Sequence, residues 1–189
     1  MTSSAAQAAR IGGGTWTIDP NHSLIEFAAK HFDIAYVKGR FRKFSGTVTV
    51  DEQDLLKSSV ELTIDATSVE SQAVQMREEL IRGEEMLEAD KYPTISFKST
   101  RIQQQDPTHF VVSGDLTLHG QTKPVDVPLE FGGVVTTRMG MRAGFSGYRT
   151  VNKSDFGVPF NREFEPGRPV VGEQIKVELQ VELAPQQTS

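Results

Sequence analysis

The segment from Ile175 to Leu183 alternates apolar and polar residues without a break, and this pattern constrains the fold more than any other feature of the sequence. Successive side chains of a β-strand point to opposite faces, so alternation with a period of two predicts a strand with one apolar face. The residues on that face are Ile175, Val177, Leu179, Val181 and Leu183. Such a strand needs an apolar interior to face, which either side chains or a ligand can fill.

The same alternation recurs from Thr15 onward and predicts about eight or nine strands linked by short turns. One example is the tight hairpin turn expected at His119-Gly120-Gln121. Sequential strands with hairpin spacing favour an antiparallel up-and-down arrangement. We therefore expect an all-β fold with one helical insertion.

The helical insertion is expected at about residues 71–89, where the period changes. Met76, Leu80 and Leu87 would form its apolar stripe, and Gly83 would divide it into two short helices. Residues 1–14, which end in three glycines, are expected to form a flexible tail, and residues 185–189 a second one. Residues 15–184 would then form a single domain.

Composition excludes several classes of function. The net charge of −5 argues against nucleic-acid binding, which requires a basic surface. The chain has no cysteine, so it offers no thiolate nucleophile and no cysteine metal ligand. The first 14 residues lack the apolar core of roughly 7–15 residues that an export signal needs, and no apolar run approaches the roughly 18 residues of a membrane span. We expect a soluble cytoplasmic protein.

No group of residues has the pattern of a catalytic or metal site. The four histidines lack metal-site spacing, and His31 falls on an apolar strand face, where it is expected as an interior histidine. Ser146 lies between glycines but does not match G-x-S-x-G. The sequence therefore predicts no catalytic residue, no metal and no cofactor other than a bound ligand.

Basic residues in or near the expected strands are more informative, because one or two of them could contact an anionic group. We select Arg40, Arg149 and Lys153 as head-group candidates. Gly114 and Gly147 fall on expected inward faces, where the missing side chains would leave room for a ligand.

Several segments, in this order and spacing, resemble one protein family. They are Trp16 to Ser23, Val37 to Phe41, Phe44 to Gly46, Arg77 to Leu80, Lys91 to Phe97, Gly114 to Val125 and Lys153 to Gly157. Together they resemble the YceI-like polyisoprenoid-binding family over residues 15–184. Two departures are Lys153, where the family usually has arginine, and the bulky pair Phe32-Asp33 after His31.

The resemblance implies an eight-stranded antiparallel lipocalin-like barrel with the helical segment beside or across one end. It also implies a long apolar tunnel that holds a polyprenyl chain, a quinone tail or a fatty-acyl amide. Many members of this family are exported, and some form dimers, so a homodimer is one expected assembly.

We therefore predict non-catalytic binding, storage or transport of an isoprenoid lipid, either a polyprenyl phosphate or an isoprenoid quinone, with transient membrane contact. The expected lining residues are Phe27, His31, Phe41, Phe44, Ile64, Phe97, Leu116, Phe145 and Phe156. Two alternatives remain open: a lipid-acting enzyme that uses His31 or His119, and a barrel with a filled core that serves a structural or partner-binding role.

Overall fold

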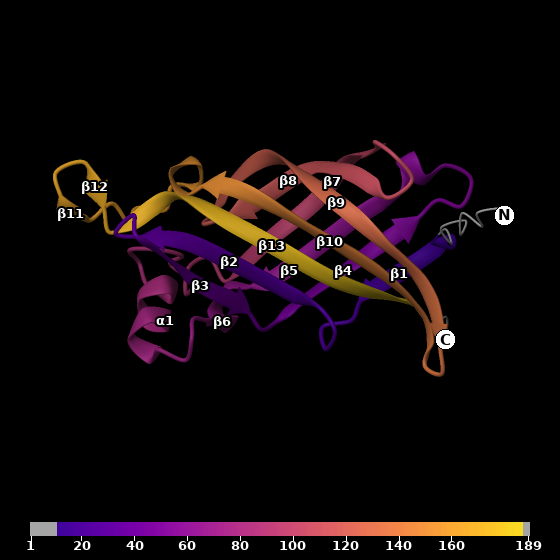
Figure 1. Ribbon diagram of the computed structural model, residues 1–189, viewed down its shortest axis with the longest axis horizontal. Coiled ribbons are helices and arrows are strands. Elements are labelled where there is room, and N and C mark those ends of the chain that lie inside the picture. Colours follow the sequence, from indigo (N-terminus) through magenta and orange to yellow (C-terminus); the bar gives the residue numbers. More distant parts are fainter. Residues whose placement is uncertain (1–10, 187–189) are drawn as a thin grey trace, which may run out of the picture.

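The computed structural model describes residues 11–186 and shows a closed antiparallel barrel of eight strands with a single α-helix at one end (Figure 1). Around the barrel the strands follow the order β1 (Gly14–Ile18), β4 (Phe44–Val50), β5 (Ser59–Asp65), β7 (Thr94–Gln104), β8 (His109–Leu118), β9 (Gln121–Thr137), β10 (Gly140–Asn152) and β13 (Val171–Pro185). The predicted fold is confirmed. Residues 1–10 of the expected N-terminal tail and 187–189 of the C-terminal tail lie outside the described residues.

Strand β13 closes the barrel, because it has strand partners along both of its edges. One edge pairs with β10 from Asn152 to Ala143. The other edge pairs with β2 (Leu24–His31) in its first part and with β1 near its end. Strand β2 continues through β3 (Ala35–Phe41) to β6 (Val69–Glu70), so these three strands extend the sheet beyond the closed barrel.

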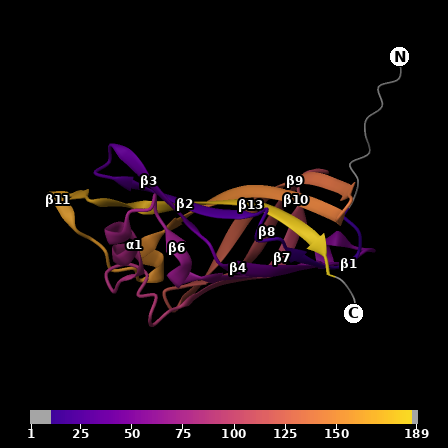
Figure 2. The same ribbon diagram turned by 90° about the horizontal axis from the view of Figure 1, so that it is seen from below.

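The remaining elements are short, and several gather at one end of the barrel. They are the 3-10 helices η1 (Leu55–Lys57), η2 (Ala66–Ser68) and η3 (Lys153–Phe156), the helix α1 (Gln75–Arg82), and the hairpin of β11 (Glu163–Glu165) and β12 (Arg168–Pro169). Two perpendicular views place α1, the β2–β3 turn and the β11–β12 hairpin at the same end (Figures 1 and 2). We call this the α1 end, and the opposite one the β1 end.

The helix is much shorter than the sequence predicted. Gln72 and Ala73 have φ of 55°, in the left-handed region, so a right-handed helix cannot begin before them. Gly83 ends the helix, with its N–H bonded to the carbonyl groups of Glu79 and Leu80. Met76, Leu80 and Leu87 of the predicted stripe all line the cavity described below, but Leu87 lies beyond the helix end, Met76 is 78% exposed, and Ile81 is the buried residue of α1.

The predicted hairpin turn at His119-Gly120 is confirmed. Leu118 pairs with Gln121, and the two residues between them have φ of 50° and 71°. Two positive φ angles in a two-residue loop are typical of the turn that matches the twist of antiparallel strands.

Two separate apolar clusters fill the ends of the barrel. At the β1 end Trp16, Val50, Phe131, Ala143 and Leu183 are buried together. Near α1, a second cluster contains Ile25, Phe41, Ile64, Ala66, Val69, Ile81, Ala89 and Ile95. A third cluster, Phe97, Ile102 and Val112, lies on β7 and β8. Buried packing in all three clusters stabilises a barrel whose interior is not filled throughout.

The expectation that Gly114 and Gly147 leave room for a ligand is wrong. A Cβ at Gly114 would lie 2.5 Å from the Phe97 ring and 2.5 Å from the Lys98 carbonyl oxygen. At Gly147 it would lie 2.2 Å from the Pro128 carbonyl oxygen. The space that these glycines free is therefore taken by neighbouring side chains and backbone.

Replacing Gly114 with alanine is expected to lower the free energy of unfolding by about 1–3 kcal/mol, the usual cost of overpacking. The backbone oxygen of Lys98 cannot move aside as a flexible side chain could. Urea unfolding measures the change. Gly144→Ala is the control, because a Cβ there meets nothing within 4 Å. Equal stability of the two variants would contradict this assignment.

Candidate ligand-binding cavity

The barrel encloses a cavity of about 820 Å³. This volume lies within the roughly 300–1,000 Å³ typical of small-molecule sites. Every barrel strand contributes apolar side chains to its wall, and β2 and α1 add others. The interior therefore offers a long chain molecule an apolar environment from one end toward the other.

The alternating segment of β13 forms part of this wall. Ile175, Val177, Leu179, Val181 and Leu183 all line the cavity, as the period of two requires. Val177 and Leu179 face inward, yet they stay partly exposed, because the space in front of them is open. The interior is hollow at these positions, in contrast to the filled core considered as one alternative.

Most of the predicted lining residues do lie in the cavity wall. Those that line it are Phe27, His31, Phe41, Ile64, Phe97, Leu116 and Phe145. Phe44 instead packs, partly buried, against the cluster near α1. Phe156 is 1% exposed within η3 and is not among the lining residues. Strand alternation could not place Phe156, because it lies in a helical turn.

All charged residues in the cavity wall are basic. They are Lys30, Arg77, Arg149, Lys153 and Arg162, and no aspartate or glutamate lines the cavity within residues 11–186. The sequence reasoning missed Lys30, Arg77 and Arg162. Arg77 and Arg162 come from α1 and a loop, where no strand period applies, and the period puts Lys30 of β2 on the face opposite to Ala29 and His31. Lys153 and Arg162 are paired with Glu173 and Glu85, so Lys30, Arg77 and Arg149 are the lining residues whose positive charge favours an anionic group over a cationic one.

Arg149 is placed in the wall by the strand period itself. On β10 it shares the inward face with Phe145 and Val151, and it lies opposite Val177 of β13. In the described part of the chain its guanidinium forms no ion pair. Five fixed N–H donors are therefore available to a ligand in the cavity.

Arg40 lies elsewhere. Gly39 and Phe41 are the buried residues around it on β3, so alternation turns Arg40 outward. There its Nη2 lies 3.0 Å from Glu70 Oε2, and Arg42 contacts the other oxygen of the same carboxylate. Arg40 is thus neutralised on the outside of the sheet and does not line the cavity.

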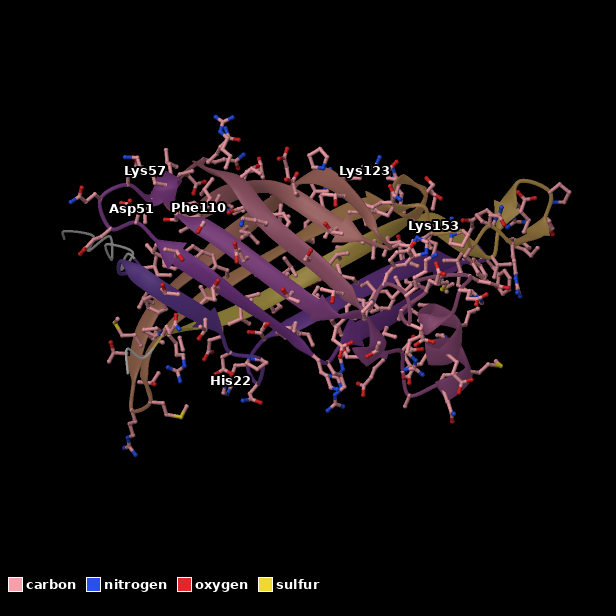
Figure 3. All side chains as sticks on the ribbon, turned by 180° about the vertical axis from the view of Figure 1, so that it is seen from behind. His22, Asp51, Lys57, Phe110, Lys123 and Lys153 are labelled. Atoms are coloured by element: carbon pink, nitrogen blue, oxygen red, sulfur yellow. The ribbon has the colours of Figure 1, made fainter. Side chains whose placement is uncertain are left out.

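Lys153 lines the cavity but already has an acidic partner. Its Nζ lies 2.8 Å from Glu173 Oε2, and Ser154 donates to the other oxygen through its backbone N–H and its hydroxyl. Partial burial alone would raise the pKa of Glu173, but these hydrogen bonds outweigh it and lower the pKa to about 2. Figure 3 shows Lys153 at the α1 end, far from Phe110 and Lys57.

The low pKa of Glu173 predicts a loss of stability in acid. The carboxylate stabilises the fold fully above its unfolded pKa, and this contribution disappears as the pH falls through about 2. Glu173→Gln should therefore cost roughly 0.2–1 kcal/mol at pH 7, the size of an exposed ion pair, and should reduce the acid dependence below pH ~4.5. Denaturant unfolding at several pH values measures both. A Glu130→Gln variant is the control, and identical profiles for the two variants would contradict the assignment.

His31 and His119, the two histidines considered for catalysis, have different surroundings. His31 lines the cavity, but within residues 11–186 it has no hydrogen bond to a carboxylate or hydroxyl. His119 lies outside the cavity wall, stacks on Tyr92 with a centroid distance of 4.8 Å, and places Nε2 3.4 Å from Glu88 Oε2. These contacts hold the β8–β9 turn against the segment after α1.

One further group of titratable residues, Asp19, His22 and Glu182, has its ligand atoms within 4.8 Å of one another. Arg142 Nε lies 3.2 Å from Glu182 Oε1, and this positive charge opposes a cation there. Asp19 and His22 are bonded to each other, with Nδ1 3.0 Å from Oδ2. The group therefore ties the β1–β2 turn to β13.

Comparison with protein-family models matches residues 16–183 to the YceI-like domain. The chain belongs to the YceI-like family. The resemblance found in the sequence is confirmed, and the family match covers nearly all of the barrel. Among the described residues, no helix is long and apolar enough to cross a membrane.

Relatives of this YceI-like chain include a UPF0312 protein of Vibrio cholerae, 39% identical over 138 residues that cover 72% of each chain. Among solved structures, Burkholderia cenocepacia BcnA aligns with a TM-score of 0.76 and 22% identity, covering 87% of this chain and 98% of that one. A polyisoprenoid binding domain from Saccharophagus degradans aligns with a TM-score of 0.70 and 16% identity, covering 90% and 98%. At these identities both structures show a shared fold.

Proposed function

We propose that this protein binds one long-chain isoprenoid lipid in its barrel and stores or transports it without chemical change. The observation that carries the proposal is the 820 Å³ apolar cavity with Arg149 in its wall. Of the two predicted ligands, a polyprenyl phosphate suits this wall better than an isoprenoid quinone, because every charged lining residue is basic. The name of the Saccharophagus degradans domain, which shares the fold, supports an isoprenoid chain.

The energetics favour reversible exchange. Each buried carbon of the chain contributes about 0.8 kcal/mol on leaving water. A lipid that starts in a bilayer is already out of water, so transfer into the barrel gains much less. Shape and head-group contacts then decide which lipid is bound, as a carrier or store requires.

Solvent extraction of the purified protein, followed by mass spectrometry, tests the proposal. We expect about one isoprenoid lipid per chain. Recovery of a stoichiometric non-isoprenoid lipid, or of a chemically altered product after incubation with an isoprenoid, would overturn it. An isoprenoid quinone in place of a phosphate would keep the carrier function and refute the head-group preference.

The Arg149→Gln variant is expected to bind farnesyl phosphate about 10–100-fold more weakly, because a hydrogen bond to a charged group contributes about 1.5–3 kcal/mol. Its affinity for farnesol, which lacks the charge, should change little. Arg40→Gln is the matched control and should leave both affinities unchanged, since Arg40 is paired with Glu70 on the outside. Fluorescence titration or calorimetry measures the constants, and an equal loss for both ligands would argue against a head-group role.

We also propose that the protein is cytoplasmic, as expected from the sequence. Fractionation of cells that produce the protein from its own gene checks it, and recovery in an exported fraction would refute it.

A further inference from the structure

The mouth of the cavity can be located from residues that line it and also face the exterior. Val74, Met76 and Leu80 line the cavity, and they are 38%, 78% and 37% exposed. All three belong to α1 or its N-terminal boundary. A side chain that reaches both the cavity and bulk solvent marks an opening, so the mouth lies at the α1 end.

Two more exposed apolar residues lie at the β2–β3 turn and the start of β3, at the same end as α1. Ile34 is 81% exposed and Tyr36 60% exposed. The Ser71 hydroxyl donates to the Lys38 carbonyl oxygen at 2.8 Å, which holds β3 against the chain just before α1. Figures 1 and 2 show the turn and the helix at the same end. We call the residues Ile34, Tyr36, Val74, Met76 and Leu80 the apolar rim.

The turn that carries Ile34 is held firmly. Phe32 donates its backbone N–H to the Val170 carbonyl at 3.0 Å, and its ring packs edge-on against Phe164 of β11 with a centroid distance of 5.0 Å. Arg168 lies over the Phe164 ring, 4.6 Å from its centroid. The packing fixes the turn, so the exposure of Ile34 is a feature of the folded protein.

Exposed apolar side chains are informative when they gather in one place. We propose that the apolar rim is a membrane-docking surface, which seats the mouth on a lipid bilayer while lipid enters or leaves. The inference rests on the proposed function, because a membrane is where a long isoprenoid lipid resides. It adds the location of the contact and the residues that make it.

Charges of both signs surround the rim, and three of the basic side chains are available to phosphate groups of a bilayer. Lys30, Lys38 and Arg77 lie on β2, β3 and α1, and in the described chain none of them forms an ion pair. Asp33 lies in the β2–β3 turn, and Glu78, Glu79, Glu84 and Glu85 lie on α1 or directly after it, so acidic residues at this end offset the basic charge. Apolar contact is therefore expected to supply most of the affinity for the bilayer.

Two double variants test the surface, and both replace exposed apolar side chains with aspartate. Ile34→Asp with Tyr36→Asp alters the rim at residues that do not line the cavity. Val135→Asp with Met139→Asp is the matched control on the β9–β10 hairpin, where these residues are 60% and 71% exposed. That hairpin lies at the β1 end (Figure 1).

Flotation with vesicles of phosphatidylcholine and phosphatidylglycerol measures binding. We expect the wild type and the hairpin variant to float with the vesicles, and the rim variant to bind at least about tenfold more weakly. No binding by the wild type, or an equal loss in both variants, would overturn the proposal. A third result would also overturn it: the wild type self-associates, and the rim substitutions abolish this self-association without any effect on vesicle binding. The rim would then be a contact surface for a second copy of the chain.

Farnesyl phosphate binding in solution separates this proposal from the proposed function. The rim variant should keep wild-type affinity for this short ligand and should take up long polyprenyl phosphate from vesicles at least about tenfold more slowly. Normal affinity together with wild-type uptake would refute the docking surface alone. Vesicle binding by a wild type that takes up no isoprenoid would refute the proposed function and leave the docking surface standing.

Discussion

Replacing Leu179 with arginine is expected to reduce isoprenoid binding at least about hundredfold. Leu179 lines the cavity and lies opposite Gly147, at a point where the wall is apolar. Loss of a buried leucine contact costs about 1.5–3 kcal/mol, and the arginine adds the cost of removing a charge from water. Since every 1.4 kcal/mol is tenfold in affinity, the two effects together exceed a hundredfold change. Titration with farnesol, which carries no charge to pair with arginine, measures it.

The neighbouring residue provides the control. Gln180 is exposed and points to the opposite side of β13, so Gln180→Arg should leave farnesol affinity unchanged. Leu179→Met keeps the volume and polarity of the side chain and should bind farnesol with nearly normal affinity. It provides a second test at this position if the arginine variant does not fold. If folded Leu179→Arg bound farnesol as well as the wild type, the ligand would not occupy this part of the barrel.

Replacing Trp16 with alanine is expected to lower the free energy of unfolding by about 3–5 kcal/mol. Trp16 is 2% exposed and packs with Phe131 and Leu183 in the cluster at the β1 end. Its indole Nε1 also donates to the Gly12 carbonyl at 2.9 Å. Strand β1 pairs with both β4 and β13, so loss of this side chain weakens the β1–β13 pairing that completes the barrel. Guanidinium unfolding followed by circular dichroism measures the change.

Trp16→Phe separates ring packing from the hydrogen bond, and it should cost less than half as much as alanine. Leu56→Ala is the control, because Leu56 is an apolar residue that is 52% exposed on η1. A loss below about 1 kcal/mol for Trp16→Ala would contradict the role of the cluster, since that is the size of an ordinary surface effect.

Much of the barrel wall could be predicted from the sequence. On β13 the alternation is long and regular, and it predicts the correct face for Val177 and Leu179; the prediction for Phe145, on the glycine-rich β10, also agrees with the structure. The strand period also assigns Arg149 to this face, which makes it the head-group candidate with the strongest structural basis. The family segments added strand order and closure, which alternation alone does not specify.

The rest depended on features that a strand period does not encode. Phe156 looked like a lining residue, but η3 turns it into a separate buried site. Arg40 looked like a head-group ligand, but its neighbours on β3 face inward and leave it beside Glu70. The start of the helix is set by the left-handed residues Gln72 and Ala73, whose side chains give no clear signal of that conformation, whereas its end at Gly83 could be predicted. The volume of the cavity depends on the combined size of the inward side chains of eight strands, and no local sequence pattern predicts that sum.

The position of β13 has a consequence for the order of events during synthesis. Strand β13 pairs with β10 along one edge and with β1 and β2 along the other, and it is translated after these three strands. Pairing between the first and last barrel strands is a contact of very long sequence separation, which slows folding. The enclosed space therefore comes into existence only after translation has passed residue 185. Until then β10 has no partner along one edge, and the wall of the cavity is open there.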